Sequence, residues 1–246
     1  MSTVVNYVCD PDRTEQVWES AKTVLKLSAS VIDEIIVFIV SDAPLTFSFP
    51  DQRVVAKWVP PRFGDYFYGN KTYLCDLDAE RVVFLDADTF VLESIDSLWS
   101  DSNADFLARP GRAYYQPEWQ ERIWSATRKK LGSKNVPMYN AGALVFQNRS
   151  HQVIRNSWVG IIEKYLDKTF ALPYPDKRMP EQFSLSLAIS RKKYGLTIAE
   201  LKEHQHRYGW ENPEPIGSTV FHTSALYENF LPQLGVSDSA IDTDTI

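Results

Sequence analysis

Two carboxylates, Asp86 and Asp88, follow directly after an apolar run of strand-forming residues at 82–85. Two acids at the end of a buried strand repel each other unless a cation lies between them. Side chains at i and i+2 of an extended segment point the same way, so both carboxylates could reach one ion. Hard divalent cations such as Mg²⁺ and Mn²⁺ prefer oxygen ligands. The pair therefore indicates a metal site, and the plainer alternative is a turn that follows the strand.

The hydrophobic pattern predicts the elements that position this pair. Strand and helix signals alternate at the start of the chain, which favours an α/β fold with a mostly parallel central sheet flanked by helices. We expect strands at 4–8, 32–40, 53–59, 82–86, 105–108, 141–146 and 220–222, and helices at 17–27, 71–77, 120–131, 153–165 and 181–189. Ligands of such sheets bind beyond the carboxyl ends of the strands, where Asp86 and Asp88 lie.

Length and composition fit one domain, which we place at residues 1–236, followed by a polar acidic tail at 237–246 that frays. The 26 Lys and Arg stand against 32 Asp and Glu, a net charge of −6. This balance argues against nucleic acid as a partner but leaves room for a local basic patch.

Two cysteines, Cys9 and Cys75, are too few for a disulfide scaffold or a zinc cluster and indicate reduced thiols. The N-terminus lacks the basic and apolar regions of a signal peptide. No apolar run approaches the ~20 residues of a membrane helix. We therefore expect a cytoplasmic protein without a transmembrane segment.

The stretch RVVFLDADTFVLESIDSLW, residues 81–99, resembles the Asp-x-Asp region of GT-A fold glycosyltransferases, and most closely that of family 8, the glycogenin and galactosyltransferase-like group. Four further segments resemble the family in the same order. They are GNKTYL at 69–74, MYNAGALVFQN at 138–148, MPEQFSLSLAI at 179–189 and FHTSA at 221–225. The resemblance implies a GT-A-like fold and transfer of a sugar from a nucleotide-sugar, often a UDP-sugar, to an acceptor hydroxyl with retention of configuration.

The resemblance also implies a metal site in which Asp86, Asp88 and His222 hold Mn²⁺ or Mg²⁺ against the donor diphosphate. Taken alone, a histidine after an apolar strand is more often a core or loop residue, although a neutral imidazole is a sound third ligand. His204 and His206 have the spacing of metal ligands but no evident third partner, so we leave them at the surface.

Two cations are candidates for the leaving diphosphate. Lys71 is either an ordinary solvated lysine or a point charge that stabilises the leaving group, and Arg62 is the weaker candidate for the same task. In the family, the residues matching Asn140 and Ala141 line the sugar pocket, where the alternative is a turn. Ala87, between the two acids, agrees with the family pattern and is placed with the donor-binding residues.

The resemblance places Glu181 and Gln182 near the anomeric carbon, where the family usually has Asp-Gln. An acid in the first turn of a helix is also explained by the helix dipole alone. We expect the end of the first strand to face the nucleobase and ribose, with contacts that are often made by the backbone. This strand end comprises Tyr7, Val8, Cys9 and Asp10. Asp105 is a weaker candidate for a sugar contact.

One departure from the family lies after His222, where a Gly and a Lys usually touch the diphosphate and this chain has Ala225 and Glu228. Because Glu228 would repel a diphosphate, a catalytically degenerate binding module is the first alternative. A sugar nucleotidyltransferase is the second, but it would need a glycine-rich phosphate loop, and CDPDRTE at 9–15 has no glycine. The acceptor is unknown, and loops at 110–119 and 173–180 could line its cleft.

Overall fold

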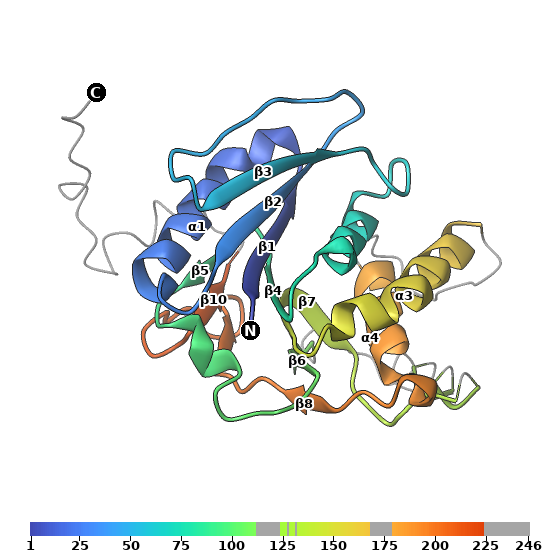
Figure 1. Cartoon of the computed structure of the whole chain (residues 1–246). Coiled ribbons are helices and arrows are strands. Elements are labelled where there is room, and N and C mark those ends of the chain that lie inside the picture. The colour runs from blue at the N-terminus through green and yellow to red at the C-terminus, as the bar shows by residue number, and fades with distance from the viewer. Residues whose placement is uncertain (112–123, 127, 131, 168–178, 224–246) are drawn as a thin grey trace, which may run out of the picture.

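The computed structural model describes residues 1–111, 124–126, 128–130, 132–167 and 179–223, which form an α/β fold with two sheets (Figure 1). The main sheet has the order β3-β2-β1-β4-β7-β6-β8, and the small sheet has the order β5-β10-β9. The main-sheet strands are β1 Thr3–Cys9, β2 Glu34–Val40, β3 Val54–Val59, β4 Arg81–Leu85, β6 Phe106–Pro110, β7 Tyr139–Phe146 and β8 Ile198–Glu200. Those of the small sheet are β5 Thr89–Val91, β9 His206–Tyr208 and β10 Val220–His222.

Helices cover both faces of the main sheet. The α-helices are α1 Thr14–Ser28, α3 Ser150–Leu166 and α4 Met179–Ser190, and the 3₁₀ helices are η1 Pro11–Arg13, η2 Phe67–Asp76, η3 Ile95–Leu98 and η5 Lys192–Tyr194. Helix α1 and the small sheet lie on one side of the main sheet, and η2, α3 and α4 lie on the other (Figure 1). No described helix is long and apolar enough to cross a membrane.

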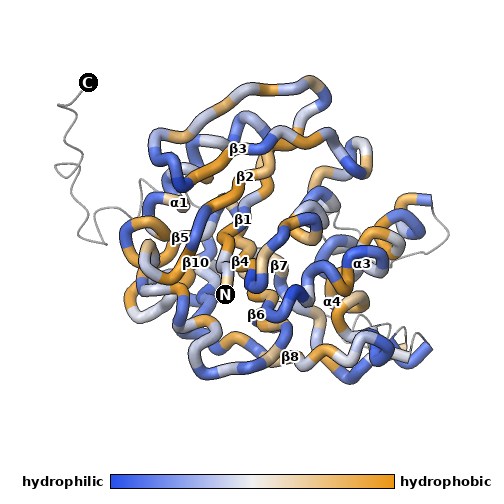
Figure 2. Tube along the Cα trace, in the orientation of Figure 1, coloured by the Kyte–Doolittle hydropathy of each residue, from blue (hydrophilic) through white to orange (hydrophobic). Residues whose placement is uncertain are grey.

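Strands β3, β2, β1 and β4 run parallel, whereas β7 is antiparallel to both β4 and β6. The predicted mostly parallel sheet is therefore confirmed. In β1, Val4 and Val8 lie on the side covered by η2, while Val5, Tyr7 and Cys9 lie on the side covered by α1. Because both faces are covered, the central strands are mainly hydrophobic (Figure 2), although β1 also buries the polar Asn6. Full burial of one such aliphatic side chain stabilises the fold by about 1.5–3 kcal/mol.

The helix predicted at 71–77 is a 3₁₀ helix that begins earlier, at Phe67. Side chains compete here for backbone groups: Asn70 Nδ2 donates to the Phe67 carbonyl at 2.9 Å, and Thr72 Oγ1 donates to the Gly69 carbonyl at 2.8 Å. Such local bonds favour the tighter helix. Strands β5, β8 and β9 were not predicted, because three residues are too few to show a period.

Of the helix predicted at 120–131, residues 124–126 and 128–130 are described and are helical. The tail at 237–246, the domain end at 236 and most of both candidate acceptor loops lie outside the described residues.

Candidate active site

Asp86 and Asp88 lie on a turn between β4 and β5. Both the amide and the hydroxyl of Thr89 donate to the Asp86 carbonyl, at 3.1 and 2.7 Å. The prediction that residues 86–88 are extended is therefore wrong, because they form the turn that leads from β4 into the small sheet. The two carboxylates nevertheless converge: one oxygen of each and one ring nitrogen of His222 all lie within 4.8 Å of one another.

The small sheet brings His222 to this turn. Strand β10 is antiparallel to β5 with His222 opposite Thr89, and the Thr223 amide donates to the Asp88 carbonyl at 3.0 Å. Nε2 of His222 lies 3.2 Å from Oδ1 of Asp88. Burial alone would raise the pKa of Asp88, but the hydrogen bond and charge of His222 outweigh it and hold that pKa below its usual value. Asp88 is therefore ionised in the site.

Gly142 leaves room for the imidazole. A β-carbon at this position would overlap Cε1 and Nδ1 of His222 and would crowd Oδ1 of Asn140 at 2.9 Å. The Gly142 amide donates to that same Asn140 oxygen at 2.8 Å, and its carbonyl accepts from the Asp86 amide at 2.8 Å. Gly142, which follows the predicted sugar-pocket pair Asn140 and Ala141, therefore packs directly against His222, the third candidate ligand.

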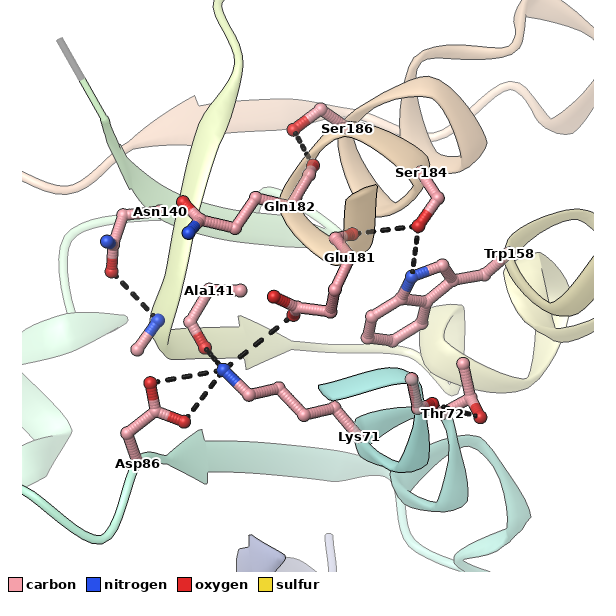
Figure 3. A network of polar contacts seen from close by, with 12 residues as sticks. Lys71, Thr72, Asp86, Asn140, Ala141, Trp158, Glu181, Gln182, Ser184 and Ser186 are labelled. Atoms are coloured by element: carbon pink, nitrogen blue, oxygen red, sulfur yellow. Dashed lines mark hydrogen bonds and ion pairs between the residues drawn. The ribbon is translucent and has the colours of Figure 1, made fainter. Parts of the chain in front are cut away.

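Lys71 supplies the charge that the two aspartates need in a buried setting. Its Nζ lies 2.8 Å from Oδ1 and 3.1 Å from Oδ2 of Asp86, and it donates to the Ala141 carbonyl at 3.2 Å (Figure 3). Burial lowers the pKa of Lys71, but the negative charge of Asp86 and its hydrogen bond to Lys71 outweigh burial and raise it. Lys71 is therefore a protonated, buried lysine that holds Asp86, and it is not a solvated helix residue.

Glu181 enters the same cluster from the first turn of α4. Its side chain is 2% exposed, and its Oε1 lies 3.7 Å from Lys71 Nζ without a hydrogen-bond partner among the described residues. Burial raises the pKa of Glu181 to about 8, Lys71 opposes this shift, and the negative charge of Asp86 adds to it. At neutral pH this carboxyl group holds a proton. Its position in the first turn of a helix would not cause this, because the helix dipole favours the ionised form there.

Gln182 and Asn140 add two buried amides beside Glu181. The Gln182 side chain reaches from α4 toward β7, where Asn140 and Ala141 lie (Figure 3). Oε1 of Gln182 has no hydrogen-bond partner among the described residues, and neither has Nδ1 of His222. Buried polar atoms without partners are uncommon, so the Gln182 oxygen indicates where a polar ligand would complete the site, whereas Nδ1 of His222 packs against Gly142.

The end of β1 offers mainly backbone. The Tyr7 side chain is buried and its hydroxyl lies 2.8 Å from Oγ of Ser20 in α1. Val8 and Cys9 are also in the core, and burial together with the charge of Asp10 raises the pKa of Cys9 to about 12. Asp10 is half-buried, 3.6 Å from Arg13 Nε. A ligand at this strand end would therefore meet the backbone and Asp10.

Two further candidates have other partners. Arg62 pairs with Asp76, donates to Thr72 Oγ1 at 3.1 Å and stacks 3.9 Å from the centre of the Tyr73 ring. Its contacts thus hold it on η2, and none of them is to the metal candidates. Asp105 accepts hydrogen bonds from Asn148 and Thr197 and so links the start of β6 to its neighbours. These contacts lie near the C-terminal end of β7, whereas Asn140 lies near the other end of that strand.

Three aromatic side chains beside His222 were missed. His206 was expected at the surface, but it is fully buried, with its ring 5.6 Å from that of His222 and tilted by 9°. Burial, with the neighbouring charges of His222 and Arg109, holds the pKa of His206 well below its usual value. Tyr208 and Trp210 complete the cluster, and the Trp210 ring lies 5.0 Å from His222. The signal was the alternation of His206, Tyr208 and Trp210, which is typical of a strand with one aromatic face.

The sequence model of glycosyl transferase family 8 matches residues 15–156, more than half of the chain. The chain belongs to glycosyl transferase family 8 and is a glycosyltransferase. No curated protein matches it significantly.

Solved structures show the same fold. The galactosyltransferase LgtC, solved with donor and acceptor sugar analogues, matches with a TM-score of 0.65 at 14% identity, over 94% of this chain and 95% of LgtC. An active-site mutant of LgtC matches equally well at 12% identity. The bifunctional glycosyltransferase WbbM, without ligand, matches with a TM-score of 0.64 at 12% identity, over 96% of this chain and 50% of WbbM. These similarities confirm the GT-A-like fold.

Proposed function

We propose that this glycosyltransferase is metal-dependent and moves a sugar from a nucleotide-sugar, a UDP-sugar in the first instance, to an acceptor hydroxyl with retention of configuration. The observation that carries the proposal is the convergence of Asp86, Asp88 and His222 within 4.8 Å at the carboxyl end of β4. Ligands bind at this edge of open α/β sheets. LgtC, which has the same fold, binds donor and acceptor sugar analogues, and this supports the same substrate class here.

The donor atoms fit a divalent cation. Two carboxylates and a histidine suit Mn²⁺, and Mg²⁺ is the alternative, although it prefers oxygen ligands throughout. When bound, such a cation would neutralise negative charge on a leaving nucleoside diphosphate. The unpartnered Nδ1 of His222 faces Gly142, while Nε2 faces Asp88 and would be the coordinating atom.

The other residues have roles that follow from their contacts. Lys71 fixes the Asp86 carboxylate through both oxygens, so we assign it first to positioning this ligand. Neutral Glu181 can donate a hydrogen bond to a sugar hydroxyl without adding a third negative charge to those of Asp86 and Asp88. The amides of Gln182 and Asn140 can bind further hydroxyls, and Ala141 and Ala87 leave space for the sugar ring. Asp10 and the backbone of residues 7–9 would meet the nucleoside.

A degenerate nucleotide-sugar-binding module remains the second candidate, because Ala225 and Glu228 stand where the family usually has Gly and Lys. Both residues lie outside the described part of the chain. Arg62 is held by Asp76, so it is a poor substitute for the missing lysine. Two buried free thiols, Cys9 and Cys75, support a cytoplasmic location.

Thermal unfolding of the protein with UDP, GDP, CDP and dTDP, each with and without Mn²⁺, tests the proposal. A ligand at about 100 times its dissociation constant adds roughly 2.7 kcal/mol of stability, which gives a clear rise in Tm. We expect a rise with one nucleotide that requires Mn²⁺ and is absent in Asp88→Ala. Hydrolysis or transfer of the matching nucleotide-sugar then separates an enzyme from a binding module. No rise with any nucleotide would overturn the metal-dependent donor site.

A further inference from the structure

Two basic segments that lie far apart in the sequence meet at the C-terminal end of α4. Residues 124–135 contain Arg128, Lys129, Lys130 and Lys134, and residues 190–197 contain Arg191, Lys192 and Lys193. Ser133 and Arg191 form an isolated β-bridge, and the Lys134 amide donates to the Ser190 carbonyl at 2.7 Å. Arg128 is buried and donates to the Lys134 carbonyl at 3.3 Å, so it holds this segment together. We call the other six residues the basic patch. Figure 2 shows hydrophilic chain where it leaves α4 toward β8.

The basic patch is unusual for a chain of this charge. Its two segments hold seven of the 26 Lys and Arg and none of the 32 Asp and Glu, leaving 19 basic against 32 acidic residues, a net charge of −13, elsewhere. Lys129, Lys130, Lys192 and Lys193 are exposed, and no ion pair joins them to an acid of the described chain. Asp105 is an acid near Lys134, and its oxygens already accept hydrogen bonds from Asn148 and Thr197.

Helix ends explain part of this arrangement. Lys129 and Lys130 precede Gly132, and Lys192 and Lys193 precede Gly195, and both glycines have the positive φ of a helix C-cap, +63° and +68°. Cations near a helix C-terminus are favoured by the unpaired carbonyl groups there. This effect accounts for lysines at each helix end separately. It does not account for two such ends being joined side by side without an acid between them.

We propose that the basic patch binds a membrane surface that carries anionic lipids. Five of its six cations are lysines, and the four exposed ones are all lysines, whose compact ammonium groups suit diffuse attraction to many headgroups, whereas paired arginines would suit recognition of one phosphate. Tyr194 is half-buried beneath Lys193, so the patch offers no open ring on which a nucleic-acid base could stack. The net charge of −13 elsewhere repels a long polyanion, but a flat membrane meets only one end of the molecule.

The patch also has a fixed relation to the active site. Glu181 lies in the first turn of α4 and Arg191 follows its last residue, so the two are about 15 Å apart along the helix axis. An enzyme attached through the patch would therefore hold its site close to the membrane. The proposal does not depend on the proposed donor or metal, because binding to vesicles needs neither.

Sedimentation of the full chain with vesicles tests the proposal. We expect binding to phosphatidylcholine vesicles that contain about a third phosphatidylglycerol, and none to pure phosphatidylcholine. Binding should fall sharply between about 0.1 and 0.5 M NaCl, because salt screens exposed charges. One lysine near such a membrane changes partitioning about fivefold, so Lys192→Gln with Lys193→Gln should weaken binding on the order of 30-fold.

The matched control is Lys26→Gln with Lys57→Gln, which removes two exposed lysines on α1 and β3, across the molecule from α4 (Figure 1). It should leave vesicle binding within about twofold, since these residues lie outside the patch. Equal losses in both double variants would overturn the proposal, as would binding that neither variant changes. Binding to a short duplex RNA without binding to vesicles would also overturn it and would assign the patch to nucleic acid. Circular dichroism checks that both variants fold.

Discussion

Gly142 and His222 are in direct contact, with the imidazole packed where a β-carbon of residue 142 would otherwise lie. This relationship couples a main-sheet strand to the third candidate metal ligand. It also explains a glycine in the middle of β7, where its missing side chain would normally weaken the strand.

Gly142→Ala should displace His222 and weaken Mn²⁺ binding, and the overpacking should cost about 1–3 kcal/mol of unfolding free energy. Titration of Mn²⁺ followed by electron paramagnetic resonance measures the affinity. The control is Gly160→Ala in α3, where an added β-carbon meets nothing within 4 Å. It should stabilise the helix by up to ~1 kcal/mol and leave Mn²⁺ affinity unchanged. Normal Mn²⁺ affinity in Gly142→Ala would show that His222 does not bind the metal.

His222→Ala should lower Mn²⁺ affinity by at least ~10-fold, since it removes one of three protein ligands. His204→Ala is the matched control, because His204 is exposed and lies close to His222 in the sequence. The same titration measures both variants. If the control loses as much affinity, the histidine assignment is wrong.

Lys71→Met should destabilise the fold, because the ionised Asp86 carboxylate would lose the buried cation that pairs with both of its oxygens. Breaking a buried ion pair costs about 3–5 kcal/mol, and we expect the low end because the Asp86 side chain is 24% exposed. Chemical denaturation measures the loss, and added Mn²⁺ should restore part of it by compensating Asp86. Lys22→Met, which breaks the exposed pair with Glu19, should cost less than ~1 kcal/mol. Equal losses would refute a special role for Lys71.

Glu181→Gln should change the pH dependence of stability. The pKa of Glu181 is raised to about 8 in the folded protein, above its unfolded value of 4.5. Between these values the folded state binds the extra proton, so this group lowers stability as pH rises from 4.5 to 8, by at most ~1.4 kcal/mol per pH unit. The variant lacks this slope, and it should gain stability relative to the wild type across the window. The difference between the two proteins cancels the contributions of His206 and His151. A constant difference from pH 5 to 8 would contradict the buried, protonated state.

The parts of the fold that follow from sequence are those with long regular patterns. Strands β1, β2 and β4 are mainly apolar because both faces are covered, and α1 shows its buried stripe at Val17, Ala21, Val24 and Leu25. The pair Asp86 and Asp88 stands out because it interrupts such a pattern. The resemblance to family 8 identified further candidate site residues, such as His222, that no hydrophobic pattern connects with Asp86 and Asp88.

The rest depends on contacts between distant segments. Nothing local in α4 shows that Glu181 would be buried against Lys71, since an acid in a first helical turn is ordinary. The turn at Asp88 and the burial of His206 depend on the pairing of three-residue strands, which carry too little periodicity to predict. Likewise, the basic patch exists only because Ser133 meets Arg191.

The order of the site residues along the chain has a consequence for synthesis. Lys71 leaves the ribosome before Asp86, whereas His222 follows it by well over a hundred residues, on the order of ten seconds at ~5–20 residues per second. During that interval Asp86 can pair with Lys71, but Asp88 has no His222 beside it and β5 has no β10 to pair with. The proposed metal site would therefore be complete only when the late strand β10 docks against β5.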